Sequence, residues 1–275
     1  MQVAQVIKKE IHAKIVVLIF IIFSTIWIYA NFFQPTENIY RDIFTNIYGL
    51  IALTGGISGL LISRKWGSFH SAIGKSMIFF SFGLLAQDFG QLSYNYYYYI
   101  LGTDLPYPSI GDLGYWGSIP LYLLGMYFLG KSVGMKAGFR SIKAKLFSII
   151  TLITVLVSTY FLFLQGIEID FSQPLIFILD AMYPVAQAIN VSALIIVYVL
   201  SRKYMGGIMR PRVLLLIAAY TMQYISDFTF LYQIGNETWV VAGINEYMYM
   251  FSYFLMSLGL IQLKTVSDNL RSNTD

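Results

Sequence analysis

The feature that most constrains this chain is a series of apolar runs, each about 20 residues long, that are separated by short polar loops. Crossing the hydrocarbon of a bilayer requires a helix of this length, whereas shorter amphipathic segments build the core of a soluble protein. The runs occupy residues 13–33, 42–63, 73–99, 112–132, 145–165, 174–200, 211–234 and 244–264. The sequence therefore predicts an all-α, polytopic membrane protein with about eight transmembrane helices.

The composition agrees with a bilayer as the main solvent and excludes several kinds of chemistry. Charged residues make up only 12% of the 275 residues, about half of what soluble domains carry. The absence of cysteine excludes disulfides, thiolate metal sites and cysteine nucleophiles. The two histidines, His12 and His70, lie beside basic clusters, so we expect no metal site in the membrane and no cofactor. The net charge of +4 is spread over helix ends and does not indicate nucleic-acid binding.

Charged residues in the loops predict the orientation of the bundle. The basic loops carry Arg64, Lys65 and Lys75, then Lys131, Lys136, Arg140, Lys143 and Lys145, then Arg202, Lys203, Arg210 and Arg212. The intervening connections carry Asp104 and Asp112, then Glu168 and Asp170, then Glu237 and Glu246, and their one basic residue is Arg41. Because basic loops stay in the cytoplasm, we expect a multi-pass plasma-membrane protein with cytoplasmic N- and C-termini.

The two halves of the chain resemble each other, which predicts a tandem 4+4 repeat of residues 1–134 and 135–275. The matching segments are Ile62-Ser63-Arg64-Lys65-Trp66 with Leu200-Ser201-Arg202-Lys203-Tyr204, Gln87-Asp88-Phe89 with Ser226-Asp227-Phe228, Ser118 with Ser252, and Leu124-Gly125 with Leu258-Gly259. Units of four helices both enter the membrane from the same side. The expected symmetry is therefore a pseudo-twofold along the membrane normal, not an inverted repeat.

Acidic and amide side chains inside the apolar runs are the candidate functional residues. A charge at the centre of a transmembrane helix costs roughly 2.5–3.5 kcal/mol on insertion, so such residues mark sites by default. Polar stripes at helical spacing fall in the half of each run that the loop charges place outside. The predicted ligand- or ion-binding residues of an outward-opening pocket are Asp88, Gln91, Tyr94, Asp180, Tyr183, Gln187, Asp227, Glu246 and Tyr249.

Plainer interpretations compete with this one. Polar side chains often only join helices, and a carboxylate at a helix N-terminus, as expected for Asp112 and Glu246, can simply cap the helix. The tyrosine run at residues 94–99 is typical of an aromatic belt at the headgroups. With no intramembrane cation to match them, the acids are protonated, bind a cation or accept hydrogen bonds, and the sequence leaves these alternatives open.

One loop resembles a known family. The segment Leu105-Pro106-Tyr107-Pro108-Ser109-Ile110-Gly111-Asp112, followed by Tyr115 and Pro120, is similar to the Pro-aromatic-Pro-Ser-x-x-Asp loop in the N-terminal membrane sensor regions of prokaryotic diguanylate cyclases and histidine kinases. Weaker similarity covers Asp180-Ala-Met-Tyr183-Pro184-Val-Ala-Gln187, Ser226-Asp227-Phe228 and Asn245-Glu246-Tyr247, with Gln187 in the place of an acid. The resemblance spans roughly residues 73–264 and implies a sensory module, here without an output domain.

These observations favour a receptor-like sensor or ligand-binding module over two alternatives. A small-solute or cation-coupled transporter suits tandem repeats, but the inner halves of the runs are almost purely apolar. An intramembrane hydrolase lacks a glycine-flanked aspartate motif, and we expect no enzyme. The expected partners are the bilayer, a small molecule or cation on the outer side, and a separate cytoplasmic or membrane signalling protein.

Overall fold

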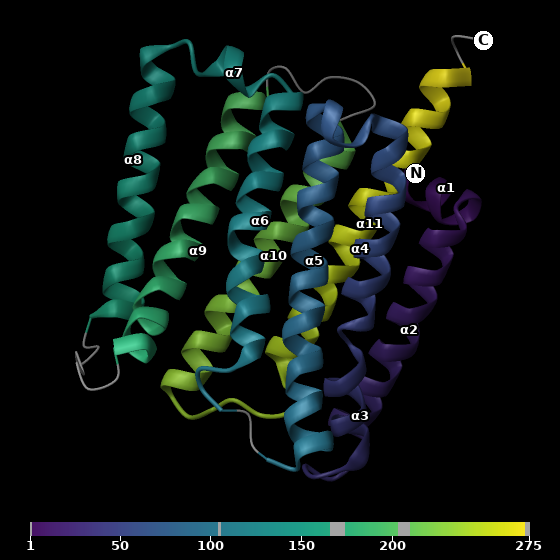
Figure 1. Cartoon of the computed structure of the whole chain (residues 1–275), viewed down its shortest axis with the longest axis vertical. Coiled ribbons are helices and arrows are strands. Elements are labelled where there is room, and N and C mark those ends of the chain that lie inside the picture. Colours follow the sequence, from purple (N-terminus) through teal and green to yellow (C-terminus); the bar gives the residue numbers. More distant parts are fainter. Residues whose placement is uncertain (1, 104–105, 166–173, 203–209, 273–275) are drawn as a thin grey trace.

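The computed structural model of the chain describes residues 2–103, 106–165, 174–202 and 210–272, all built from helices and their connections, with no strand among them (Figure 1). The longer helices are α2 (Ile11–Phe32), α4 (Leu50–Ser63), α5 (Ala72–Asn95), α6 (Ile110–Ser132), α8 (Ile142–Thr159), α9 (Pro174–Ser201), α10 (Arg210–Gly235) and α11 (Ile244–Ser272). The shorter ones are α1 (Gln2–Lys9), α3 (Ile39–Ile47), η1 (Arg64–Trp66), η2 (Ser68–His70), η3 (Tyr96–Leu101), α7 (Met135–Gly138) and η4 (Tyr160–Leu164). The loop residues Asp104, Glu168, Asp170 and Lys203 lie outside the described residues.

Each range that the sequence predicts as a helix is helical, and α3 with α4 together cover the second range. Five helical segments in the described part of the chain are long and apolar enough to cross a membrane. They are Ile11–Phe32, Ile39–Trp66, Ile142–Leu162, Pro174–Ser201 and Arg210–Ile234. The prediction of an all-helical, multi-pass membrane protein is confirmed to that extent.

Glycines let the central helices approach closely, which is how helices associate in lipid. In α6, a methyl group added to Gly114 would lie 2.5 Å from the carbonyl oxygen of Ala86 and 2.7 Å from the backbone nitrogen of Gly90, both in α5. In α11, Gly259 lies in the same way against the side chain of Leu216 from α10. The α5–α6 and α10–α11 pairs therefore form the tightly packed centre of the bundle.

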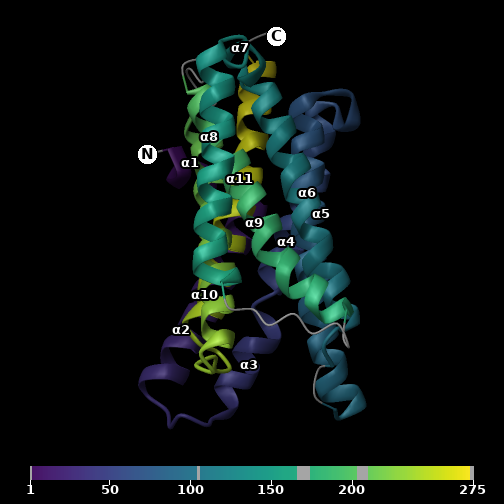
Figure 2. The same cartoon turned by 90° about the vertical axis from the view of Figure 1, so that its left-hand side faces the viewer.

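Helices α2 and α8 lie at the edges of the bundle (Figures 1 and 2). Helix α8 packs against α9, and its opposite face exposes apolar residues such as Leu146, Ile149 and Ile150. Helix α2 exposes Leu18, Ile21 and Ile22 in the same way. Exposed aliphatic faces of this kind suit lipid contact.

The two ends of the bundle differ. At the α7 end, which also holds η1, η2 and the last turns of α11, the neighbouring half of the bundle is filled by buried apolar residues. Met77, Phe80, Met126, Leu216 and Met256 are each at most 1% exposed there. We call this region the α7 half, and the opposite end, beside α3 and η3, the cavity end.

Candidate functional site: a polar and aromatic cavity

A cavity of about 670 Å³ opens at the cavity end of the bundle. Side chains from α3, α5, α6, α9, α10 and α11, and from the loops before α6 and before α11, form its wall. Aromatic rings are its largest class of lining residue, and three acids, four amides, one threonine and one serine complete the lining apart from its aliphatic residues. Its volume lies within the range of about 300–1,000 Å³ that is typical of small-molecule sites.

Asp227 of α10 accepts hydrogen bonds from three donors, of which Gln187 and Tyr249 also line the cavity. Gln187 of α9 donates from Nε2 to Oδ2 at 2.6 Å, and the Tyr249 hydroxyl of α11 donates to Oδ1 at 2.8 Å. Gln223, one turn earlier in α10, adds a longer contact of 3.4 Å from Nε2 to Oδ1. Three helices thus converge on one carboxylate, and all three of these donors are uncharged.

Glu246 lies in the first turn of α11 and ties that turn to α3. Its Oε2 accepts from the Thr45 hydroxyl at 2.6 Å and from the backbone N–H of Ala242 at 3.0 Å. Ala242 has a left-handed backbone, with φ of 53°. Its carbonyl accepts a hydrogen bond from Trp27 Nε1 at 2.8 Å, so α2, α3 and α11 together fix this loop. Capping of the helix, which the sequence favours for Glu246, is compatible with its place on the cavity wall.

Asp112 helps to cap the N-terminus of α6, as its position in the sequence predicts: Ser109 is the N-cap, and Asp112 in the first turn completes a capping box. Its Oδ2 accepts from the backbone N–H of Ser109 at 2.7 Å, and Ser109 Oγ accepts from the N–H of Gly111 at 3.1 Å. The other oxygen, Oδ1, receives a long contact of 3.5 Å from the Tyr183 hydroxyl across the cavity. The segment from Tyr107 to Tyr115, which comprises the loop before α6 and the first turns of that helix, therefore both starts the helix and lines the cavity.

The floor of the cavity is a layer of hydrogen-bonded amides. Gln87 of α5 donates from Nε2 to Ser118 Oγ at 2.7 Å and accepts at Oε1 from the Tyr253 hydroxyl at 3.0 Å. Gln91, one turn further along α5, donates to the carbonyl of Thr45 at 2.7 Å. Below this layer, towards α7, the described interior is mainly apolar and includes a few buried serines such as Ser76 and Ser81.

Seven of the nine residues predicted from the sequence line this cavity: Gln91, Tyr94, Tyr183, Gln187, Asp227, Glu246 and Tyr249. For Asp180, the structure describes the backbone, within α9, but not the side chain. The structure thus brings together residues from α5, α9, α10 and α11, although their role in binding stays a prediction.

Asp88 lies elsewhere. It is buried but is not among the residues that line the cavity, and a methyl group added to Gly49 would come within 3.1 Å of its Oδ1. The reason is the rotation of the helix. Gln87 and Gln91 point to the cavity, and Asp88, one residue on from Gln87, is turned by about 100° towards the junction of α3 and α4. The predicted stripe on α5 is therefore divided between two surfaces.

Some lining residues were not among the predicted site residues. Tyr48 and Tyr115 belong to aromatic positions that also suit a core or a headgroup belt. Trp239 and Asn245 come from the loop before α11 and its first turn, where no helical periodicity indicates which side chains face inward. The Pro-aromatic-Pro-Ser-x-x-Asp loop was a usable signal for Tyr107 and Ser109, because it singles out that segment.

Two lining amides have unused hydrogen-bonding atoms. Asn245 is 1% exposed, and neither its Oδ1 nor its Nδ2 has a partner among the described residues. Gln187 is 6% exposed, and its Oε1 likewise has none there. Buried polar atoms are normally satisfied, so each of these atoms calls for an explanation.

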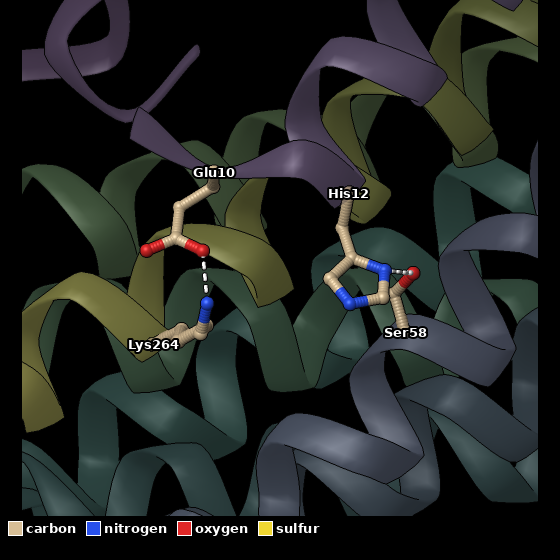
Figure 3. A network of polar contacts seen from close by, with 4 residues as sticks. All are labelled: Glu10, His12, Ser58 and Lys264. Carbon is tan, nitrogen blue, oxygen red and sulfur yellow. Dashed lines mark hydrogen bonds and ion pairs between the residues drawn. The ribbon is translucent and has the colours of Figure 1, made fainter. Parts of the chain in front are cut away.

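A second polar cluster lies towards the other end of the bundle (Figure 3). Glu10, between α1 and α2, forms an ion pair with Lys264 of α11, and His12 Nδ1 lies 3.1 Å from Ser58 Oγ of α4. These contacts join the N-terminal segment to α11 and α4. We call the Glu10–Lys264 pair the terminal ion pair.

Metal ligation receives no support from the geometry. No group of three or more histidine, aspartate or glutamate side chains in the described part of the chain is arranged to hold one metal ion. Comparison with protein-family models, with curated proteins and with solved structures found no match to this chain. The function must therefore be inferred from the site itself.

Proposed function

We propose that this protein is a receptor-like membrane sensor, or ligand-binding module, whose ligand occupies the cavity between α3, α5, α6, α9, α10 and α11. The observation that carries the proposal is the convergence of Asp112, Asp227 and Glu246 on one open cavity whose wall is otherwise largely aromatic. Carboxylates and amides are costly in a bilayer, and gathering them around an opening favours a binding role over simple attachment of helices. We propose no catalysed reaction.

We further propose eight membrane spans, with the cavity end outside and the α7 end in the cytoplasm of the cell. Helices α5, α6 and α11 have 24, 23 and 29 residues, which is long enough to cross a bilayer. The basic loops at residues 64–75 and 131–145 lie at the α7 end in Figure 1. The positive-inside rule then assigns that end to the cytoplasm.

A tandem 4+4 repeat is supported by corresponding contacts in the two halves of the chain. Gln87 bonds to Ser118 between α5 and α6, and Gln223 bonds to Ser252 between α10 and α11. Contact of α4 with α11 likewise corresponds to contact of α9 with α6. An alignment of the two halves that pairs Gln87 with Gln223 differs by about one helical turn from the alignment that pairs Asp88 with Asp227. In the first of these alignments Gln91, not Asp88, corresponds to Asp227.

The apolar α7 half favours a sensor over a transporter. A substrate path to the cytoplasm would have to pass Phe80, Met126 and Leu216, which are buried and closely packed. A transporter of pseudo-twofold repeats remains the alternative, since such repeats suit alternating access. It requires a second conformation in which this packing opens.

Helix α11 is a candidate route for a signal. It carries Glu246, Tyr249 and Tyr253 on the cavity wall, and it carries Lys264 of the terminal ion pair near its other end. A ligand that moves the first turns of α11 would therefore act on the contact with the N-terminal segment. We propose that a separate cytoplasmic or membrane signalling protein reads this change, as the resemblance to sensor regions also suggests.

The proposal can be tested by filling the cavity. Leu231 lines the cavity from α10, and Ile225 lies on the same helix but is 43% exposed on its outer side. Small organic compounds of cationic, neutral and anionic classes are screened for a rise in the melting temperature of the purified protein in detergent. We expect hits that Leu231→Trp abolishes and Ile225→Trp retains. Hits that survive Leu231→Trp, or no hits in any class, would contradict the proposal.

Flux measurements separate the sensor from the transporter. A compound that binds is added to proteoliposomes containing the protein, and its uptake is followed with and without a proton or sodium gradient. The sensor account predicts no uptake above that of empty liposomes. Uptake that is lost in Leu231→Trp and kept in Ile225→Trp would establish transport instead.

A further inference from the structure

We propose that the ligand of this cavity is an organic cation, an amine or quaternary ammonium compound with an apolar or aromatic portion. The inference rests on the proposed binding function and specifies the chemistry of the ligand. It combines the charge of the wall, its aromatic surface, its unpaired amides and its size.

The charge on the wall has one sign. Asp112, Asp227 and Glu246 line the cavity, and no lysine, arginine or histidine is found among its described lining residues. The donors that contact Asp227 and Glu246 are amides, hydroxyls and a backbone N–H. Buried carboxylates are normally paired with a cation. A cationic ligand would supply the counter-charge that the wall lacks.

The aromatic surface suits the same ligand. Tyr115, Phe230, Trp239 and Tyr249 are among the rings on the wall. The face of an aromatic ring attracts an ammonium group within about 6 Å, with tryptophan the best partner, and cages of such rings bind quaternary ammonium ligands. An anion would meet both the carboxylates and the negative faces of these rings.

The unpaired amides on the wall are compatible with a ligand, although unpaired buried atoms also occur away from the cavity, at Ser81 and Tyr122. Asn245 has no partner at either amide atom, and Gln187 has none at Oε1, although both residues line the cavity and are more than nine-tenths buried. Asn245 Oδ1 and Gln187 Oε1 have almost no exposed surface in this conformation, so each would accept from the N–H group of an amine only after its amide rotates towards the cavity. Neither oxygen has a role in holding the helices together within the described structure.

The size of the cavity distinguishes an organic cation from a metal ion. A volume of about 670 Å³ far exceeds the space that one ion occupies. The acids lie on α6, α10 and α11, and no three such groups in the described residues are close enough to hold one metal ion. Carboxylates set apart by aromatic surface fit a molecule whose charge and apolar part contact different walls.

The test uses three probes of similar shape: phenyltrimethylammonium, its uncharged isostere tert-butylbenzene, and the anion benzenesulfonate. Binding to the full chain in detergent is measured by calorimetry and by the shift in melting temperature. We expect the cation to bind about tenfold or more tightly than the isostere, a difference of one decade in Kd. Asp227→Asn and Glu246→Gln should each remove most of this preference and leave binding of the isostere nearly unchanged.

Asp42→Asn is the matched control, because Asp42 is an exposed acid of α3 at the same end of the bundle and does not line the cavity. It should leave the preference for the cation intact. Equal binding of cation and isostere, tighter binding of the anion, or an equal loss in Asp42→Asn would overturn the cation assignment. Those results would leave a binding cavity in place, provided that Leu231→Trp still abolishes binding. If none of the three probes binds, the cation assignment fails, and the compound screen decides whether the binding function fails with it.

Discussion

The cavity end and the α7 half of this bundle are built from the same helices but packed by different rules. At the cavity end, Asp227 and Glu246 are surrounded by donors, and buried amides keep unpaired atoms. In the α7 half, Phe80, Met126 and Leu216 leave little exposed surface. The difference indicates that close apolar packing is concentrated in one half, and the proposed function places recognition in the other.

The strongest test of this comparison is a cavity made in the α7 half. Met126→Ala removes a side chain that is 1% exposed and packed in the core. We expect a loss of roughly 2 kcal/mol or more in the free energy of unfolding. Binding of phenyltrimethylammonium to the protein that remains folded should be unchanged, as measured by calorimetry. A larger effect on binding than on stability would show that the two regions are not separate.

The α5–α6 contact provides the next test. Gly114→Ala places a methyl group against the backbone of Ala86 and Gly90, so the helices must separate at a cost of about 1–3 kcal/mol. Gly117→Ala, in the same helix, meets nothing within 4 Å and should be tolerated or slightly stabilising. Melting temperatures in detergent measure both. Equal losses in the two variants would argue against the close packing of α5 on α6.

Removing one hydroxyl group from each of two buried tyrosines compares the cavity end with the α7 half. The Tyr253 hydroxyl donates to Gln87 in the cavity floor, and its loss in Tyr253→Phe should cost about 1 kcal/mol. The Tyr122 hydroxyl has no partner among the described residues, so Tyr122→Phe should be neutral or stabilising. Denaturant unfolding of the two variants side by side checks the order. A larger loss of stability in Tyr122→Phe than in Tyr253→Phe would mean that the hydrogen-bonded floor of the cavity extends further towards α7.

The smallest effect is expected at the terminal ion pair. Lys264 is partly exposed and Glu10 is largely buried. Because water reaches the lysine, we expect the pair to contribute about 1 kcal/mol, and less at high salt. Lys264→Met should therefore lower stability slightly at low salt and hardly at all in about 0.5 M salt, which is roughly three to five times the ionic strength of 0.1–0.15 M at which exposed charges interact over about 8–10 Å. Binding of the cationic probe should not change. A loss that persists at high salt would show that packing, and not charge, holds α1 to α11.

The sequence alone predicted the ranges of the long helices but only part of the site. Apolar runs of membrane-spanning length marked those ranges, whereas the break between α3 and α4 and the short helix α7 were not predicted. Asp112 was recognisable as a cap from its place at the start of an apolar run. The orientation of Asp88 was not recognisable from the sequence, because neighbouring residues on a helix point about 100° apart. The similarity between the two halves did not help, because it allows alignments that differ by about one helical turn.

Loop residues were harder still to assign. Trp239 lines the cavity from the loop before α11, a loop in which Ala242 has a left-handed backbone and is hydrogen-bonded to Trp27 and Glu246. No periodic pattern encodes such a loop, since its course is set by contacts between segments far apart in the chain. The unpaired atoms of Asn245 could be found only once its neighbours were known.

Chemical access to the two regions tests the central claim most directly, and the chain suits it because it contains no cysteine. Leu231→Cys and Met126→Cys are placed in membrane vesicles of known orientation and treated with a membrane-impermeant thiol reagent on one side at a time. We expect Leu231→Cys to react from the extracellular side only, more slowly when phenyltrimethylammonium is present, and Met126→Cys to react from neither side. Reaction of Leu231→Cys from the cytoplasmic side, or of Met126→Cys from either side, would contradict a binding cavity that opens outward above a closed core.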